Sequence, residues 1–102
     1  MPNFVRVAGV ADIKPGGARR VEIEGYEIAL FNVDGRYYAV DAVCPHRGGP
    51  LEEGTLDGEE VTCPWHGAVF NVTTGAVLSG PAPTDLRAYP VRQNGENIEI
   101  EV

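Results

Sequence analysis

Two short segments hold every cysteine and every histidine of this chain. They are Cys44-Pro45-His46 and Cys63-Pro64-Trp65-His66, and each offers one thiol and one imidazole beside turn-forming residues. Thiolate sulfur and imidazole nitrogen are common ligands of zinc and of iron–sulfur centres. Because both cysteines and both histidines belong to this pattern, no cysteine remains for a disulfide elsewhere and no histidine remains as a separate catalytic base.

Besides an iron–sulfur centre, three interpretations of the same residues remain open. They are buried thiols beside incidental histidines, a disulfide between Cys44 and Cys63, and a Cys2His2 zinc site. Zinc is the most serious of these, because two thiolates and two imidazoles complete a closed tetrahedral site. Zinc modules usually place Cys-x-x-Cys in one segment and the paired histidines in another, whereas each segment here is mixed. The mixed pairing within each segment therefore favours a metal centre other than zinc.

The residues that follow each cysteine resemble the two ligand loops of the Rieske iron–sulfur proteins. Residues 44–51 read C-P-H-R-G-G-P-L, and residues 63–70 read C-P-W-H-G-A-V-F. The resemblance implies one [2Fe–2S] cluster, with the cysteines on one iron and the histidines on the other. The implied ligands are Cys44, His46, Cys63 and His66. It also implies that histidine ligation raises the reduction potential above that of all-cysteine ferredoxins.

Four positions depart from the high-potential members of that family. Gly49 and Trp65 stand where those proteins have a disulfide between the loops, and Ala68 and Phe70 stand where they have Ser and Tyr hydroxyls. Without those hydrogen-bond donors we expect a potential near the bottom of the Rieske range, about −150 mV. We expect Trp65 to be a lid or docking residue near the cluster, and the alternative is burial in the core.

The elements that must position these loops are short strands. Glycine and proline supply 21 of 102 residues (13 and 8), and β-branched or aromatic runs lie between turn signals, which predicts an antiparallel all-β fold. The expected strands are Phe4–Val7, Arg20–Ile23, Tyr26–Val33, Tyr37–Ala42, Glu60–Thr62, Val69–Asn71, Ala88–Arg92 and Asn97–Glu101. Residues 97–102 alternate between polar and apolar, so one face of the last strand should be buried. Residues 9–12 are expected to form a short turn or a single helical turn.

Strands at both ends with the ligand loops between them are similar to the Rieske fold, a β-sandwich base with a small inserted subdomain. We expect a single domain over residues 1–102. The cluster-binding subdomain is expected at about residues 43–80, and residues 1–42 and 81–102 form the base. Residues 79–83 match the proline-containing loop that covers the cluster in the family, and the alternative is an ordinary connection between strands.

Charge and hydropathy restrict the partners. The chain has 15 acidic and 8 basic residues, a formal charge of −7, which argues against nucleic acid and for a cationic partner. Its sequence shows no apolar run long enough for a membrane span and no signal peptide, so we expect a soluble cytoplasmic protein without membrane contact. Two reduced cysteines agree with that compartment.

These features are similar to the small ferredoxins that carry electrons from a flavin-dependent reductase to a ring-hydroxylating oxygenase. The chain itself is then not an enzyme, because it has no mononuclear iron triad beyond the predicted cluster ligands. The first alternative is the Rieske-like small subunit of an assimilatory nitrite reductase. The second is a zinc-stabilised interaction module that carries no electrons.

Overall fold

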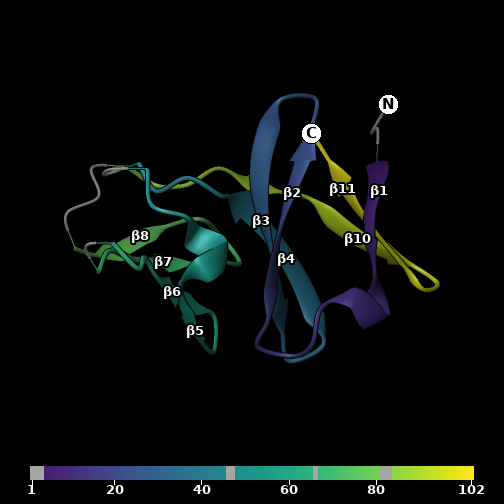
Figure 1. Cartoon of the computed structure of the whole chain (residues 1–102), viewed down its shortest axis with the longest axis horizontal. Helices are drawn as coiled ribbons and strands as arrows, with labels where there is room; N and C mark the ends of the chain where they lie inside the picture. Colours follow the sequence, from purple (N-terminus) through teal and green to yellow (C-terminus); the bar gives the residue numbers. More distant parts are fainter. Residues whose placement is uncertain (1–3, 46–47, 66, 81–83) are drawn as a thin grey trace.

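Three antiparallel sheets and two short 3-10 helices make up the computed structural model, which describes residues 4–45, 48–65, 67–80 and 84–102 (Figure 1). The outer sheet consists of β1 (Phe4–Gly9), β11 (Asn97–Glu101) and β10 (Val91–Asn94), in that order. The central sheet consists of β2 (Ala18–Ile23), β3 (Tyr26–Val33), β4 (Arg36–Asp41) and β9 (Ala88–Tyr89). The small sheet consists of β5 (Thr55–Asp57), β6 (Glu60–Thr62), β7 (Val69–Asn71) and β8 (Val77–Ser79). The 3-10 helices are η1 (Val10–Asp12) and η2 (Leu51–Glu53). The predicted all-β architecture is confirmed.

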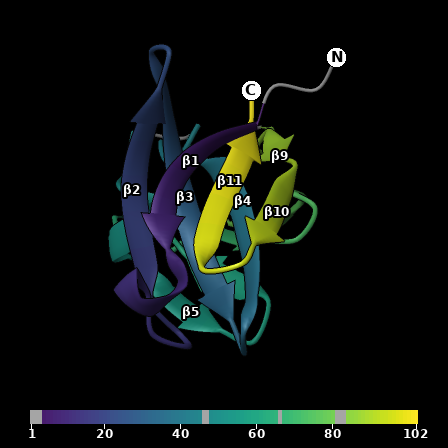
Figure 2. The ribbon, with the colours of Figure 1, turned by 90° about the vertical axis from the view of Figure 1, so that its right-hand side faces the viewer.

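Strand β3 of the central sheet is buried on both faces. Successive side chains of a strand point to opposite faces, so Ile28 and Leu30 of β3 pack toward the outer sheet while Ala29 and Phe31 pack toward the small sheet. All four side chains are fully buried. Figure 2 shows the outer sheet in front of the central one, and Figure 1 shows the small sheet on the other side. The uninterrupted apolar run in β3 follows from this two-sided burial.

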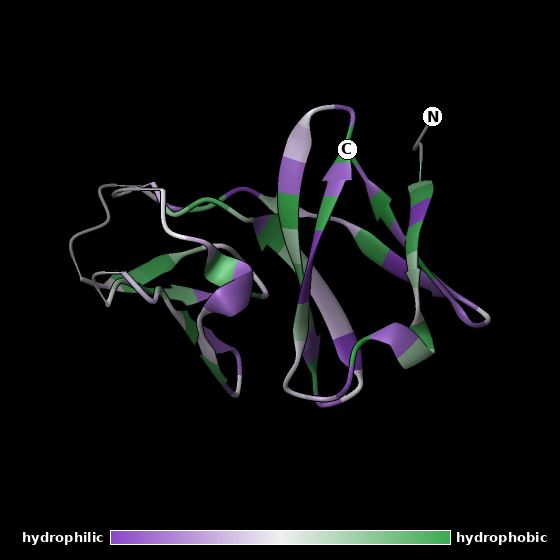
Figure 3. Ribbon diagram, viewed as in Figure 1, coloured by the Kyte–Doolittle hydropathy of each residue, from purple (hydrophilic) through white to green (hydrophobic). Residues whose placement is uncertain are grey.

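The core between the outer and central sheets contains the predicted inner face of the last strand. Ile98 and Ile100 have no exposed surface, and the polar residues between them are less buried. Figure 3 shows the alternation of hydrophobic and hydrophilic residues along the strands. The alternation therefore predicted the buried face of β11 correctly.

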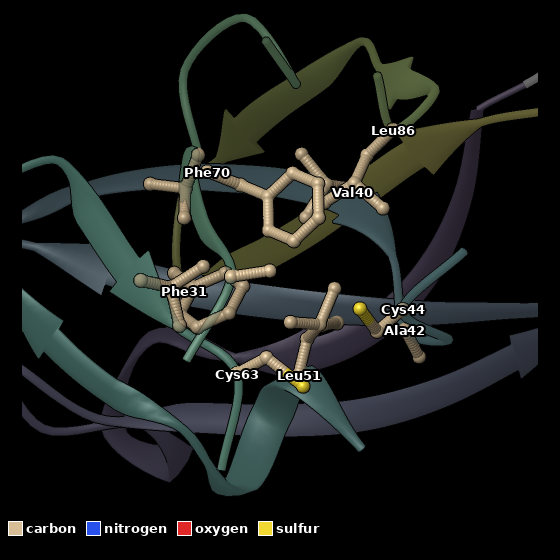
Figure 4. Close-up of a cluster of buried hydrophobic side chains, with 12 residues drawn as sticks. Phe31, Val40, Ala42, Cys44, Leu51, Cys63, Phe70 and Leu86 are labelled. Atoms are coloured by element: carbon tan, nitrogen blue, oxygen red, sulfur yellow. The ribbon is translucent and has the colours of Figure 1, made fainter. Parts of the chain in front are cut away.

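The core between the central and small sheets, here called the loop-side core, includes both cysteines (Figure 4). Its buried members are Ala29, Phe31, Val40, Ala42, Cys44, Leu51, Val61, Cys63, Ala68, Phe70, Val72 and Leu86. Val61 of β6 and Phe70 of β7 are directly paired across the small sheet. The small sheet thus packs on a face of the central sheet rather than around a core made only of its own residues.

A buried asparagine links the segment before β2 to the turn between β3 and β4 by hydrogen bonds. Asn32 is the one buried polar side chain among the residues with described burial. Its Nδ2 donates to the carbonyl oxygen of Ile13 at 2.8 Å, and its Oδ1 accepts the N–H of Gly35 at 2.8 Å. Because donor and acceptor are both satisfied, burial of this amide does not leave an unpaired polar group.

The observed strands differ from the predicted ones at several places. β1 ends at Gly9 and not at Val7, β2 begins at Ala18 and not at Arg20, and β4 covers Arg36–Asp41 and not Tyr37–Ala42. The expected single strand Ala88–Arg92 is wrong, because Pro90 separates β9, which pairs with β4, from β10, which pairs with β11. Proline has no N–H to donate to a ladder, so the chain changes sheets there. The three-residue strands β5 and β8 were not expected from the sequence. The helical turn near residues 9–12 is confirmed as η1.

Candidate metal centre

The two cysteine loops close with the same pair of backbone hydrogen bonds. In the first loop, the N–H of Cys44 donates to the oxygen of Gly49 at 2.9 Å, and the N–H of Gly48 donates to the oxygen of Cys44 at 2.8 Å. In the second loop, the N–H of Cys63 donates to the oxygen of Ala68 at 2.7 Å, and the N–H of Gly67 donates to the oxygen of Cys63 at 3.2 Å. Each loop is therefore a six-residue turn that begins at a cysteine.

Both turns place a glycine in the left-handed region at the fifth position. Gly48 and Gly67 each have a φ of 77°. An L-residue with a side chain is strained there, whereas glycine is not. The glycine that follows each predicted histidine segment is thus a requirement of the turn itself.

The strands hold these turns at one end of the molecule. The first turn follows β4 and is flanked by the isolated bridge between Val43 and Pro50, after which η2 begins. The second turn joins β6 to β7. Both turns thus start and end on elements that pack in the loop-side core.

The cysteine side chains point into protein rather than solvent. Cys44 is 2% exposed and Cys63 is 3% exposed, and both belong to the loop-side core with Leu51 and Phe70 (Figure 4). Leu51 and Phe70 therefore pack beneath the loops. The two cysteines, both within the described residues, are not joined by a disulfide bond. The disulfide interpretation of Cys44 and Cys63 is wrong for this structure.

The predicted ligands His46 and His66 lie outside the described residues, as does Arg47. In the sequence, His46 occupies the third position of its turn and His66 the fourth. Cys44 and Cys63 each begin one of two equivalent turns, and their assignment as cluster ligands stays a prediction. The participation of the two histidines stays a prediction.

The two turns meet at Gly49. A Cβ built on Gly49 would lie 2.6 Å from the Sγ of Cys63 and 3.3 Å from the Cγ of Trp65. The first distance is far below van der Waals contact, so a side chain at position 49 would displace the sulfur. Gly49 therefore lets the first loop approach the thiol of the second.

Trp65 covers this contact from outside. Trp65 is 55% exposed, so the alternative that it is buried in the core is wrong. Its first side-chain atoms lie beside Gly49, as the distance above shows. This position agrees with a lid over the junction of the two loops. An exposed indole also offers a large apolar surface to a partner.

The chain leading to the predicted third loop passes directly over the second turn. A Cβ on Gly80 would lie 2.6 Å from the Cα of Ala68, so only a glycine fits between the two backbones. The residues that follow, Pro81 to Pro83, lie outside the described part of the chain. Ala68 and Phe70, the two positions without hydroxyls, are both fully buried.

Exposed ion pairs brace the segment that follows the first turn. Arg20 of β2 contacts Glu27 of β3 at 2.9 Å and Glu52 of η2 at 3.2 Å. The hydrogen bond to Glu27 holds the pKa of Arg20 above its usual value, and the charge of Glu52 contributes in the same direction. Such exposed pairs add little stability, so their main effect is to orient η2 against the central sheet.

The sequence matches the model of one protein family, the Rieske [2Fe-2S] domain, over residues 3–90. A ferredoxin component of naphthalene 1,2-dioxygenase/salicylate 5-hydroxylase systems from Ralstonia sp is 39% identical over 100 residues, covering 98% of this chain and 96% of the relative. Among solved structures, the ferredoxin of carbazole 1,9a-dioxygenase from Nocardioides aromaticivorans IC177 has a TM-score of 0.91 at 32% identity, covering 96% of each chain.

Two further structures bear on partners and alternatives. A chain in the complex of reduced oxygenase and oxidized ferredoxin in carbazole 1,9a-dioxygenase has a TM-score of 0.90 at 34% identity, covering 96% of this chain and 92% of that one. A putative small subunit of an NADPH nitrite reductase has a TM-score of 0.83 at 24% identity, covering 96% and 97%. The latter likeness shows the fold alone.

Proposed function

This chain belongs to the Rieske [2Fe–2S] family, and on that premise we propose that it is a one-electron carrier of a ring-hydroxylating oxygenase system. The observation that supports this most directly is the pair of equivalent cysteine turns, each with a buried thiol. The proposed cluster ligands are Cys44, His46, Cys63 and His66. Two buried thiols, with one histidine in the sequence of each turn, would supply the mixed donor set of a Rieske centre.

When bound, a Rieske cluster accepts one electron and passes it on. The residues of this chain hold and shield that site. The turn hydrogen bonds fix the backbone of Cys44 and Cys63, and the apolar side chains of Leu51 and Phe70 exclude water from the inner side of the thiols. Pro45 and Pro64 restrict φ directly after each cysteine, which limits rearrangement of the loops.

The molecule is proposed to carry electrons and not to transform a substrate. Two relatives that this chain covers to 96% and 92% of their lengths are the ferredoxin component of naphthalene 1,2-dioxygenase/salicylate 5-hydroxylase systems and a biphenyl dioxygenase ferredoxin subunit, and neither is a catalytic subunit. A groove of about 510 Å³ lies between β1 and β2, and neither cysteine lines it. Oxidation of a substrate would therefore take place on a partner protein.

The proposed partners are a terminal oxygenase as acceptor and a flavin-dependent reductase as donor. Support for the oxygenase comes from the related ferredoxin that was solved in complex with one. Four acidic residues are exposed at and near the β5–β6 hairpin of the small sheet: Glu53 of η2, Asp57 of β5, Glu59 in the turn and Glu60 of β6. This negative surface suits partners with positive docking faces, because complementary charge steers association.

We also propose a cytoplasmic location and a division of the single domain into a cluster-binding part at about residues 43–80 and a base formed by the rest. None of the helices in the described part of the chain has the length and apolar character needed to cross a bilayer. Two cysteines without a disulfide between them agree with a reducing compartment.

The electron-carrier proposal is tested by the visible spectrum of freshly purified protein before and after dithionite, together with EPR of the reduced sample and iron, sulfide and zinc contents. A brown protein that bleaches on reduction and then gives a rhombic S = 1/2 signal supports it. A colourless protein with one zinc per chain refutes it and favours the zinc-stabilised interaction module. A loaded protein that reduces a nitrite reductase but no oxygenase favours the other family role.

A further inference from the structure

Asp41 connects the strand that leads into the first cysteine turn with a segment from the far end of the sequence. It is the last residue of β4, three residues before Cys44. Its Oδ2 accepts the N–H of Arg87 at 2.9 Å, and its Oδ1 accepts the hydroxyl of Tyr89 at 2.7 Å. Its own N–H donates to the oxygen of Arg87 at 3.0 Å. One residue thus makes three hydrogen bonds to the segment that precedes β10.

That segment, residues 84–89 and here called the strap, is attached at its other end to the small sheet. The N–H of Leu86 donates to the oxygen of Gly75 at 2.7 Å, and the Oδ1 of Asp85 accepts the N–H of Val77 at 2.9 Å. Leu86 is buried in the loop-side core. Gly75 and Val77 lie in the turn and strand that follow β7, which begins directly after the second cysteine turn.

Arg87 is held in place by aromatic rings. The carbon of its guanidinium lies 4.6 Å from the ring centre of Tyr89 and 5.2 Å from that of Tyr26. The two tyrosine rings are themselves in an edge contact, with centroids 6.2 Å apart. Arg87 has no carboxylate partner within ion-pair distance among the described residues. Its stacking therefore stiffens the strap at the point where Asp41 binds it.

We propose that Asp41 is a positioning residue that fixes the first cysteine turn relative to the second through the strap, with Asp85 as the corresponding attachment on the small sheet. The path runs from Cys44 through Asp41 to Arg87, and then through Leu86 and Asp85 to the β7–β8 turn and β8. Strand β8 pairs with β7, which follows the second turn. The two turns are otherwise in contact at Gly49. A second attachment restrains rotation of one turn about that contact.

The variants remove different numbers of the side-chain hydrogen bonds between Asp41 and the strap. Asp41→Ala removes both carboxylate contacts, Asp41→Asn keeps one carbonyl acceptor, and Tyr89→Phe removes only the phenol contact. The matched control is Asp12→Asn, because the Oδ2 of Asp12 also accepts a backbone N–H, that of Gly9, at 2.8 Å. Asp12 lies in η1, among the connections of the outer sheet and away from both turns.

The measurement is hydrogen exchange by mass spectrometry on the purified, cluster-loaded protein, read on peptides that cover residues 42–51 and 61–70. With Asp41→Ala, we expect exchange in both peptides to rise about tenfold, equivalent to about 1.4 kcal/mol. Asp41→Asn and Tyr89→Phe should give smaller increases. Exchange in β11 should stay at the wild-type rate. Asp12→Asn should accelerate exchange only in β1, in η1 and at the start of β2, where Arg19 lies 3.8 Å from the Asp12 carboxylate.

EPR of the reduced protein gives a second readout, since a change in the relative placement of the ligands alters the g values while a remote loss of stability does not. Wild-type g values and unchanged exchange in residues 61–70 for Asp41→Asn would overturn the proposal, as would equal effects of Asp12→Asn on both turns. If Asp41→Ala does not fold, the Tyr89→Phe and Asp41→Asn results decide the question.

The inference rests on the proposed function only where it treats the turns as the cluster site. A protein that binds no iron would refute the proposed function, yet the exchange comparison would still report whether Asp41 couples the two turns. Conversely, a loaded protein whose turns exchange independently of Asp41 would leave the electron-carrier proposal intact.

Discussion

Replacing Gly49 with alanine places a methyl group where the thiol of Cys63 now lies. The added Cβ would be 2.6 Å from the Sγ of Cys63 and 3.4 Å from the Cβ of Trp65, so the sulfur must move. Gly49 is not among the residues with positive φ, which means that the backbone alone would accept alanine. The cost is therefore steric.

The expected size follows from two opposing effects. Overpacking a closely fitted site costs about 1–3 kcal/mol. Restricting the unfolded chain by a Gly→Ala change returns about 0.4–1 kcal/mol. We expect a net loss of about 1–2 kcal/mol in the free energy of unfolding, or a fall of about 5–15 °C in the melting temperature of a domain of this size.

The assay is thermal unfolding of the loaded protein, followed by far-UV circular dichroism, with iron and sulfide content measured on the same samples. Gly9→Ala is the matched control, because a Cβ there meets its nearest atoms at 3.5–3.7 Å, an ordinary contact distance. We expect that variant to melt at or above the wild-type temperature. Gly49→Ala should also bind less iron, since it displaces a proposed ligand.

The same substitution in a Trp65→Ala protein distinguishes the clash with the sulfur of Cys63 from the clash with the indole of Trp65. If the clash with Cys63 dominates, Gly49→Ala should cost nearly as much in a Trp65→Ala protein as in the wild type. A cost that disappears in that background would mean that the ring, at 3.3 Å, and not the sulfur determines the effect. A Gly49→Ala protein with wild-type melting and iron content would refute the steric reasoning altogether.

Three further predictions concern buried positions. Ala68→Ser combined with Phe70→Tyr introduces two hydroxyls. Each donor that bonds the reduced cluster better by ~1 kcal/mol should raise the reduction potential by roughly 40 mV. A redox titration of the loaded protein checks this, and a wild-type potential above zero would contradict the low-potential expectation. Burial, together with the hydrogen bond to Asp41, raises the pKa of Tyr89 above its usual value, so its contribution to stability is complete below about pH 10 and is lost as the pH rises through the folded-state value. Denaturant titrations at pH 9 and pH 11 should show that loss in the wild type and a smaller one in Tyr89→Phe, whereas equal losses would exclude Tyr89 as the cause. Asn32→Leu removes two satisfied hydrogen bonds and leaves the oxygen of Ile13 and the N–H of Gly35 without that partner, which should cost about 1–3 kcal/mol by the same titrations; a neutral result would show that water replaces both contacts.

The sequence predicted some elements to the residue and missed others for physical reasons. β3, β6, β7 and β11 have the expected bounds, because each is a β-branched or aromatic run between clear turn signals. β5 and β8 are three residues long and contain too little pattern to detect. They form because β6 and β7 offer partners, which is a property of the folded chain. Pro90 was visible in the sequence, yet the change of sheet at that residue was not expected.

The candidate site divides in the same way. Residue types and spacing pointed to Cys44, His46, Cys63 and His66 as ligands, which stays a prediction, and the structure places both cysteines in buried positions of adjacent turns. The equivalence of the two turns was not predicted, since the histidine occupies a different position in each. The contact of Gly49 with the thiol of Cys63 and the hydrogen bonds of Asp41 join residues distant in sequence. Such contacts leave no signal in a single sequence.

The burial of β3 on both faces has a consequence for how the protein unfolds. Because alternate residues of β3 belong to different cores, melting of the outer sheet would expose Ile28 and Leu30 and thereby weaken the same strand that supports Cys44 and Cys63 through Phe31. The two halves should therefore unfold as one cooperative unit. Replacing Ile100 with a smaller residue would create a cavity in the core between the outer and central sheets. This change should accordingly shorten the lifetime of bound iron without altering any proposed ligand.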